Sequence, residues 1–288
     1  MAIIAVLQHV DLLRQLLKHD EYIIFWLKDK MIAIKSLLVP VLALTSGAVA
    51  ERLFYNSGTL RGWDYVRHEH KGTVDEVTNI LYKSGTALKM TQTYDANYHD
   101  RYHSEVDYDD GYARGDERFY GFMFRVSENW EFVSQNLNIA QFIAHRPGSD
   151  NCGDLEMPST MLWIADHQLH SRLVQGPYIG GNCHRNFVDL PNLGEIKPGQ
   201  WHKVIMQAKW EDSGSGYFKL WFDGKKAVEK YNLATTVSGD WKFQFRVGGY
   251  MNSWHDSGHM EGNQPFRQLW YDEVSVGTTY KDVDPDQN

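Results

Sequence analysis

The sequence has few cysteines, no run of Lys and Arg, and no long apolar segment. Its 288 residues carry a formal net charge of −8 and include only two cysteines. An acidic chain without a basic run is not expected to bind nucleic acid. The apolar run at residues 37–44 is shorter than the roughly 20 residues that a membrane-spanning helix needs, so we expect no membrane contact. Internal repeats and low-complexity tracts are also missing after residue 50, which indicates a single domain.

The first fifty residues differ in character from the rest. From Met31 the sequence reads MIAIKSLLVPVLALTSGAVA, with one Lys near the start, an apolar middle and small residues before Glu51. This is the layout of a secretory signal peptide. We therefore predict a non-native extension over 1–30, a signal peptide over 31–50 and a secreted, extracellular domain over 51–288. The alternative for the extension is an amphipathic helix, because VDLLRQLLK has helical spacing.

The predicted mature part is acidic and rich in tryptophan. Residues 51–288 hold 24 Lys and Arg against 33 Asp and Glu, a formal charge of −9, and nine of the ten Trp. This composition is typical of a secreted protein that handles sugars.

The two cysteines, Cys152 and Cys183, lie in segments rich in Gly, Pro and Asn. A metal site would need more ligands at tighter spacing. In an oxidising compartment, a pair of cysteines in loops predicts a disulfide.

After residue 50, short segments of β-branched and aromatic residues alternate with turn residues. Their period of two indicates strands, and no long helical pattern interrupts them. Asp223-Gly224 predicts a hairpin turn. About ten or more strands in one domain predict two stacked sheets, so we expect an all-β fold, a single-domain β-jelly roll sandwich with a concave substrate groove. The segments are TALKMTQTY, RFYGFMFRV, NIAQFIAH, STMLWIA, QLHSRLVQG, WHKVIMQAKW, GYFKLWFDG, KFQFRVGGY and RQLWYDEVSVG.

The segment FQFRVGGYMN, residues 243–252, has an unusual polar face. Alternate residues of a strand share a face, and the opposite face of this segment is largely apolar. Solvent-facing positions usually hold Lys, Thr, Glu or Ser. A row of amide, guanidinium and phenol groups suits the floor of a groove that grips something polar, although a half-solvated strand remains the alternative. The row consists of Gln244, Arg246, Gly248, Tyr250 and Asn252.

Two further segments carry polar residues in strand register. RYHSEV places Arg101, His103 and Glu105 on one face, and NIAQFIAH places Gln141 and His145 in an otherwise apolar row. A buried amide without a partner costs about 1–3 kcal/mol. Gln141 is therefore either paired within the protein or used by a ligand.

Together these three segments resemble the strand motifs of jelly-roll polysaccharide lyases, and most closely those of the fungal glucuronan lyase family. In the more distant alginate lyase families, an Arg stands where this chain has His103, which indicates a substrate other than alginate. The resemblance runs from about Tyr55 to Pro285 and includes GWDYVRHEHKGTV, RFYGFMFRV, MPSTMLW, GQWHKVIMQAKW, FKLWFDG and RQLWYDEVSVGTT.

The resemblance implies a secreted enzyme that cleaves β-1,4-linked polyglucuronate by β-elimination and leaves unsaturated uronate ends. Gln141 and His103 would hold the uronate carboxylate, while Arg246 would add charge and lower the pKa of Tyr250. Tyr250 would act as both base and acid, because the C5 proton and O4 of a gluco-configured uronate lie on one face. Substrate-binding residues would be Arg101, Glu105, Asn252 and His145.

The expected partner is an acidic polysaccharide, and we expect the enzyme to be a monomer. A chain of negative net charge should repel such a polymer, so the groove must be locally positive. The available sources are Arg101, His103, Arg246, His145 and Arg172.

The implied chemistry requires no cofactor. No EF-hand-like run of carboxylates is present. Asp272, in WYDEVSVG, resembles the position at which related jelly rolls bind a structural calcium ion away from the groove. It is the candidate ligand for a structural Ca²⁺.

Two other functions stay open at this point. A jelly-roll glycoside hydrolase would use Glu105, Asp107 and Asp109, which share one strand face. Retaining hydrolases need two carboxyl groups about 5–5.5 Å apart, and the outer two lie too far apart, so Asp107 would have to pair with one of them. A non-catalytic carbohydrate-binding module would use the tryptophans as sugar platforms, and it would not need the Gln and Tyr faces to converge.

Overall fold

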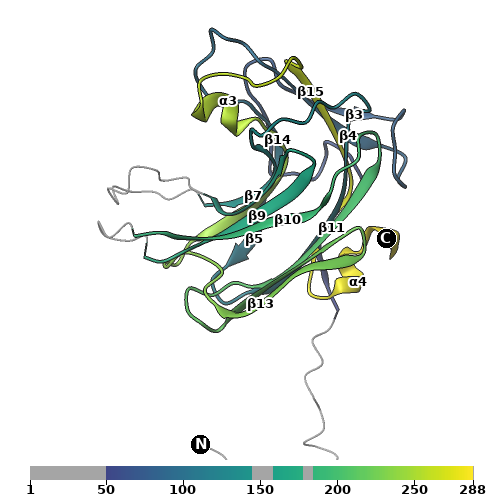
Figure 1. Cartoon of the computed structure of the whole chain (residues 1–288). Helices are drawn as coiled ribbons and strands as arrows, with labels where there is room; N and C mark the ends of the chain where they lie inside the picture. The colour runs from purple at the N-terminus through teal and green to yellow at the C-terminus, as the bar shows by residue number, and fades with distance from the viewer. Residues whose placement is uncertain (1–49, 145–157, 178–183, 288) are drawn as a thin grey trace, which may run out of the picture. The chain divides into compact units, whose positions relative to one another are not determined.

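Two antiparallel sheets form the part of the chain that the computed structural model describes, residues 50–144, 158–177 and 184–287 (Figure 1). The eight-stranded sheet has the order β13-β12-β11-β6-β15-β4-β3, with β1 paired to β15. The seven-stranded sheet has the order β10-β9-β8-β7-β14-β5-β2. Sequential strands often lie in different sheets, which is the connectivity of a jelly roll. The predicted all-β sandwich is confirmed.

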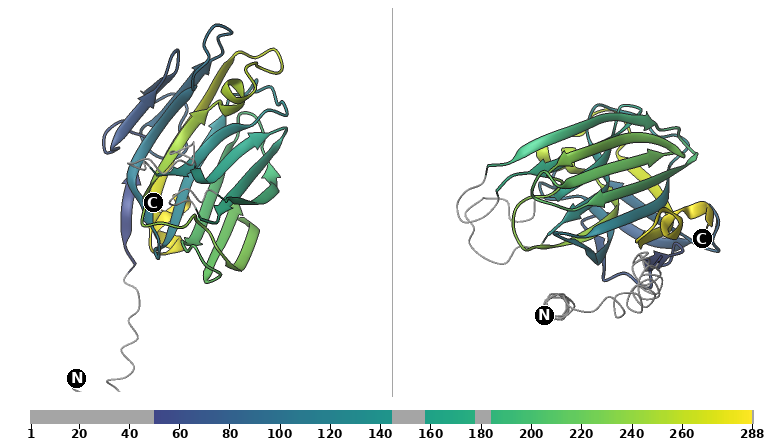
Figure 2. Two further views of the ribbon diagram at one scale, coloured as in Figure 1. Left: turned by 90° about the vertical axis from the view of Figure 1, so that its left-hand side faces the viewer. Right: turned by 90° about the horizontal axis from the view of Figure 1, so that it is seen from below.

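The expected segments all form strands, and Figure 2 shows them in two layers. The strands are β1 (Arg52–Asn56), β2 (Tyr65–His68), β3 (Thr73–Val77), β4 (Ala87–Thr93), β5 (His103–Ala113), β6 (Glu117–Val126), β7 (Leu137–Ile143), β8 (Pro158–Ala165), β9 (Gln168–Gln175), β10 (Asn186–Glu195), β11 (Trp201–Lys209), β12 (Gly216–Phe222), β13 (Lys225–Leu233), β14 (Lys242–Tyr250) and β15 (Phe266–Gly277).

The helical elements of the described part are short. They are α3 (Asn252–Asp256), α4 (Tyr280–Val283) and the 3₁₀ turn η1 (Pro285–Gln287). No described helix has the length and apolar character to cross a membrane. The predicted hairpin joins β12 to β13, and both Asp223 (φ 47°) and Gly224 (φ 76°) adopt the left-handed conformation that such two-residue turns require.

Strand β10 is an edge strand that the sequence pattern did not reveal. It contains Pro191, which has no backbone N–H to donate to a neighbouring strand. The pairing of β10 with β9 shifts register between Leu190 and Gly194, and Asn192 within this bulge has a φ of 57°. The bulge accommodates the proline while β10 still extends the seven-stranded sheet.

An aromatic core fixes which face of the seven-stranded sheet is turned outward. Phe142 on β7 and Phe245 on β14 are fully buried, and their rings stack with centroids 5.0 Å apart. Because side chains alternate along a strand, Gln141 and Arg246 must point to the opposite face. The core therefore sets the orientation of the polar residues next to it.

Strand register brings distant residues into two rows on this outward face. Directly paired residues of neighbouring strands share a face, so each row crosses several strands. One row is His103, Tyr250, Asn138, Trp163 and His170, and the other is Asp107, Arg246, Gln141, Met161, Arg172 and Asp189.

Candidate active site

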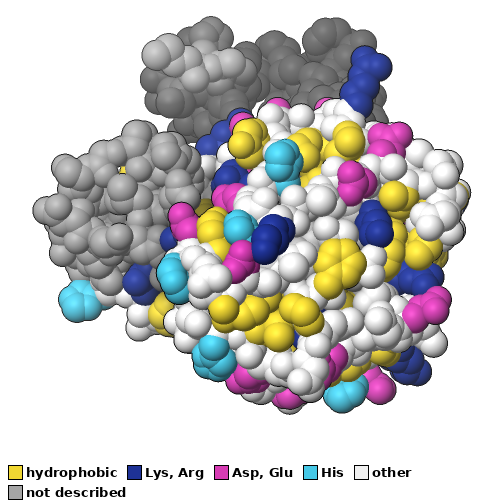
Figure 3. Space-filling model, turned by 90° about the horizontal axis from the view of Figure 1, so that it is seen from above, with side chains coloured by type: hydrophobic (Ala, Val, Ile, Leu, Met, Phe, Trp, Pro, Cys, Tyr) yellow, Lys and Arg dark blue, Asp and Glu magenta, His cyan; other side chains and the backbone are white. Residues whose placement is uncertain are grey.

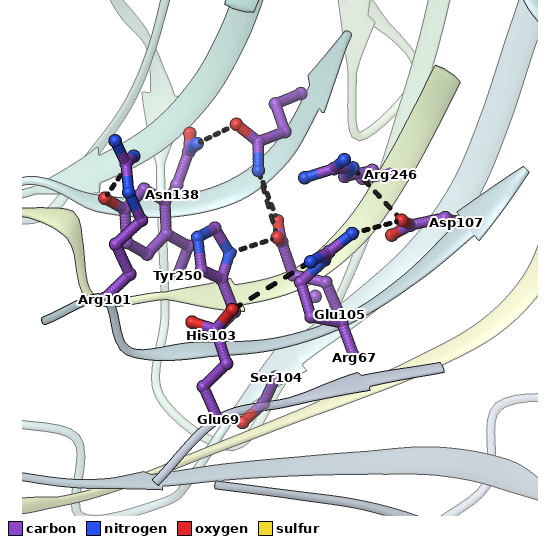
Figure 4. Close-up of polar contacts among 12 residues, drawn as sticks. Arg67, Glu69, Arg101, His103, Ser104, Glu105, Asp107, Asn138, Arg246 and Tyr250 are labelled. Atoms are coloured by element: carbon purple, nitrogen blue, oxygen red, sulfur yellow. Dashed lines mark hydrogen bonds and ion pairs between the residues drawn. The ribbon is translucent and has the colours of Figure 1, made fainter. Parts of the chain in front are cut away.

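Glu105 on β5 is the hub of a buried polar cluster (Figure 4). Its Oε2 lies 2.5 Å from Nδ1 of His103, and Gln141 Nε2 donates to Oε1 and Oε2 at 2.8 and 3.0 Å. Strand β14 runs between β5 and β7 and places Gly248 opposite Glu105. Gln141 reaches across β14 to Glu105 at this point.

The charge state of Glu105 sets the tautomer of His103. Burial alone would raise the pKa of Glu105, but the charges of His103, Arg246 and Arg67 outweigh burial and lower this pKa. An ionised carboxylate only accepts hydrogen bonds, so Nδ1 of His103 carries a proton. Nε2 is then the ring nitrogen that can exchange a proton with a substrate.

Tyr250 stacks on His103. The two ring centroids lie 3.8 Å apart with the planes inclined by 14°, and Nη1 of Arg101 donates to the Tyr250 hydroxyl at 3.4 Å. Burial raises the pKa of Tyr250 well above its ordinary value, and although Arg101 opposes this shift, Asp256 adds to it. The phenol is therefore protonated at neutral pH.

The expectation that Arg246 lowers the pKa of Tyr250 is wrong. The guanidinium of Arg246 is turned toward other partners: Nε lies 3.3 Å from Oδ2 of Asp107, and Nη2 donates to Gln244 at 2.6 Å. In a strand, positions 246 and 250 are two pleats apart, which puts the phenol out of reach. The cation beside the phenol is Arg101, which precedes β5.

Two cavities meet at Tyr250. A small one, about 80 Å³, extends toward β2 and is also lined by Arg67, His103 and Gln141. A large one, about 700 Å³, extends over β8, β9 and β10. Arg101 and Tyr250 line both cavities, and we call the combined hollow the groove. Residues of the large cavity include Trp163, Arg172, Asp189, Asn252 and Asp256.

Charges of both signs lie on the described part of the surface seen from above (Figure 3). Lys and Arg side chains are interspersed there with acidic and His side chains. A positive groove therefore depends on individual side chains. Arg67, Arg101 and Arg246 line the small cavity, and Arg101 and Arg172 line the large one.

Two details of the predicted polar row need correction. Asn252 does not continue β14 but begins α3, although it still lines the large cavity. The expectation that Gly248 keeps the groove floor low for a sugar ring is wrong. A Cβ there would lie 2.3 Å from the backbone oxygen of Ser104 and 2.8 Å from the sulfur of Met90, and its φ of 146° disfavours other residues. Close packing against β5 and β4 requires this glycine.

The comparisons with known proteins agree on a family. A protein family described as "Polysaccharide lyase" matches residues 55–275. The crystal structure of an endo-β-1,4-glucuronan lyase from the fungus Trichoderma reesei matches with 61% identity and a TM-score of 0.81, over 83% of this chain and all of that one. The chain belongs to the polysaccharide lyase family.

More distant structures resemble this chain only weakly. An alginate lyase from Aplysia kurodai has 10% identity and a TM-score of 0.48, over 79% of this chain and 99% of that one. A carbohydrate esterase from the Shiga toxin-encoding bacteriophage phi24B has 13% identity and the same TM-score, over 80% and 99%. Neither likeness carries an argument here. No curated protein matches the chain.

The carboxylates that a hydrolase would need are not available in this lyase. The side chains of Glu105 and Asp107 are completely buried and held by ion pairs. Asp109 accepts a hydrogen bond from Gln244 at 2.6 Å. No pair of these three therefore faces a sugar from both sides, as two-carboxylate hydrolysis requires.

Asp272 lies on the other sheet of the lyase. Its Oδ2 accepts the backbone N–H groups of Tyr82 and Lys83 at 3.0 and 3.2 Å, and its Oδ1 accepts that of Glu273 at 2.9 Å. Calcium takes six to eight oxygen ligands. Within the described ranges no three His, Cys, Asp or Glu residues gather around a common point, and the calcium site stays a prediction.

Some expected site residues of the lyase lie outside the described residues. They are His145, Cys152 and Cys183, so the disulfide stays a prediction. Conversely, the sequence reading missed Arg67, Glu69 and Asn138, all of which border the buried polar cluster around Glu105. Arg67 and Glu69 fall in the quoted segment GWDYVRHEHKGTV, but β2 is only four residues long and its side chains show no clear alternation of burial.

Proposed function

We propose that this polysaccharide lyase cleaves β-1,4-linked polyglucuronate by β-elimination. The observation that carries the proposal is the stacked pair of His103 and Tyr250 where two cavities meet, with Glu105 behind the imidazole. The 61% identity to a structure described as an endo-β-1,4-glucuronan lyase supports the choice of substrate.

In this proposal His103 is the base and Tyr250 is the acid. Nε2 of His103 takes the proton from C5, the electrons of the C5–H bond form the C4=C5 double bond, and the C4–O4 bond breaks. Tyr250 gives its hydroxyl proton to the leaving O4. Proton transfer from His103 to the phenolate, directly or through water, then resets both residues. A phenol with a raised pKa suits the role of acid, and an imidazole oriented by Glu105 suits the role of base. Two residues therefore account for the reaction better than a single tyrosine that acts as both acid and base.

The stereochemistry of the substrate fits this arrangement. In a gluco-configured uronate the C5 proton and O4 lie on the same face of the ring. The imidazole and the phenol are stacked on one another, so both groups approach the sugar ring from the same side. A syn elimination needs this placement of base and acid.

Negative charge that develops on the uronate carboxylate also needs donors. Arg101 is the cation next to Tyr250. The Gln141 amide nitrogen lies 2.8 and 3.0 Å from the two oxygens of Glu105, which one shared N–H can serve, and in this proposal its second N–H donates to the substrate. Preorganised donors in a buried site stabilise developing charge more than water does. Gln141 therefore serves both the cluster and the transition state.

The proposal is tested by incubating the purified full chain with glucuronan, alginate and a neutral β-1,4-glucan. We expect glucuronan to yield ultraviolet absorbance from unsaturated uronates in step with new reducing ends. Reducing ends without this absorbance would show hydrolysis and overturn the mechanism. Elimination of alginate but not of glucuronan would overturn the proposed choice of substrate.

A further inference from the structure

The small cavity of the groove contains buried polar atoms without a hydrogen-bond partner. They are Nε of Arg67, Oε2 of Glu69 and Oδ1 of Asp107. Arg67 and Glu69 line this cavity directly, together with His103 and Tyr250. Buried polar atoms almost always have partners, so several unpaired ones in one place call for an explanation. These atoms themselves are closed to solvent, but the side chains of Arg67 and Glu69 remain 24% and 32% exposed, and a ligand in the small cavity can reach this exposed part.

One carboxylate is shared between two guanidinium groups here. Oδ2 of Asp107 lies 2.9 Å from Nη2 of Arg67 and 3.3 Å from Nε of Arg246. Glu69 contributes only a distant contact, with its Oε1 3.9 Å from Nη1 of Arg67. Glu105, whose pKa both guanidinium groups help to lower, also balances these two cations, so Arg67 would recognise an anion through the geometry of its guanidinium and not through surplus charge. The guanidinium fork suits a carboxylate in particular.

The position of Arg67 relative to the catalytic pair indicates which part of the substrate it contacts. Arg67 lies on β2, the edge strand next to β5, and pairs in register with Glu105. The large cavity leaves Tyr250 in the opposite direction, over β8 to β10. A polymer whose reacting residue lies at His103 and Tyr250 therefore places its next residue over β2.

We propose that Arg67 and Glu69 form a binding subsite for the uronate residue adjacent to the one that reacts. Arg67 donates to the carboxylate of this neighbouring residue, and Glu69 accepts a hydrogen bond from one of its hydroxyls. The subsite makes the enzyme selective for consecutive uronates. This assignment rests on the proposed function, because it takes a polyuronate as the ligand.

Steady-state kinetics of Arg67→Gln on glucuronan tests the subsite. A hydrogen bond to a charged group contributes enough that its loss should raise KM about ten- to a hundredfold, with kcat changed much less. Glucuronan whose carboxyl groups have been partly reduced to alcohols is the second substrate. We expect it to be poorer for the wild type, and the gap between the two substrates to shrink in Arg67→Gln.

A structural role of Arg67 predicts a different outcome. If Arg67 served only to neutralise Asp107, the double variant Arg67→Gln/Asp107→Asn would regain the wild-type KM, and our assignment would be overturned. The matched control is Arg125→Gln on the other sheet, whose Nε is also buried without a partner and whose Nη2 pairs with Glu128. It should leave KM unchanged.

Binding measurements separate this subsite from the proposed reaction. In a Tyr250→Phe background, titration with glucuronan oligosaccharides should show weaker binding when Arg67→Gln is added, whatever the turnover of the wild type. Equal affinity with and without Arg67→Gln would contradict the subsite even if elimination is observed. Arg67→Lys keeps a cation beside Asp107 but lacks the fork, so it should bind with intermediate affinity and provides a test if Arg67→Gln fails to fold.

Discussion

Each sheet of the molecule holds a pair of buried acidic residues, and the two pairs have opposite surroundings. On β15, Asp272 accepts three backbone N–H groups, and Glu273 accepts the hydroxyl groups of Tyr55 and Ser84. On β5, Glu105 and Asp107 belong to a cluster that leaves buried atoms of Arg67, Glu69, Asp107 and Asn138 without partners. The first pair is satisfied by the protein itself, whereas the second belongs to a cluster in which some polar atoms have no protein partner.

The largest expected effect is the loss of the acid in the incomplete cluster. Tyr250→Phe removes only the hydroxyl that protonates O4, so elimination should fall by about 10²–10⁴-fold while folding and polymer affinity are retained. The rate of ultraviolet absorbance increase on glucuronan measures this. The control is Tyr231→Phe on β13, an exposed tyrosine that bonds Glu229 and should keep full activity. Near-full activity of Tyr250→Phe would contradict the mechanism.

A second comparison uses two buried glutamines that bond a glutamate, one on each sheet. Gln141 donates to Glu105, and Gln207 donates to Glu117 at 3.1 Å. Gln141→Ala removes a donor to developing charge, so kcat should fall by about 10²–10³-fold. Gln207→Ala should leave kcat unchanged. An effect of Gln141→Ala on KM alone would show that the amide binds the ground state and not the transition state.

Asp272 and Glu273, whose hydrogen bonds come from the protein itself, should matter for stability and not for turnover. Asp272→Ala leaves three backbone donors without their acceptor, at a cost of roughly 1–3 kcal/mol for each one that water does not reach. Urea unfolding should show this lower free energy of unfolding, while kcat of the folded fraction stays at the wild-type value. A lower kcat in fully folded Asp272→Ala would place this residue in the catalytic machinery.

The sequence predicted the fold well because its signals are local. Alternation of apolar and polar residues located the core strands, and Asp223-Gly224 located a hairpin. Strand β10 was missed because Pro191 and a bulge break the alternation. Strand β2 was missed because it is short and lies at an edge, and with it Arg67 was missed.

The candidate site was predicted less completely because side-chain direction depends on register between strands. The sequence left open whether Gln141 is paired within the protein or used by a ligand, because its partner Glu105 lies two strands away. Arg246 and Tyr250 share a strand face, yet Asp107 on the neighbouring strand holds the guanidinium and Arg101 approaches the phenol. Such pairings arise from tertiary structure and leave no pattern in one segment.

The central claim is that His103 acts as the base and Tyr250 as the acid. The pH dependence of kcat on glucuronan tests it most directly. The raised pKa of Tyr250 keeps the phenol protonated between about pH 8 and pH 10, where it is competent as an acid. We therefore predict that kcat stays constant from about pH 8 to pH 10. A kcat that rises about tenfold per pH unit over this interval would show that the phenolate is the base and would contradict the account.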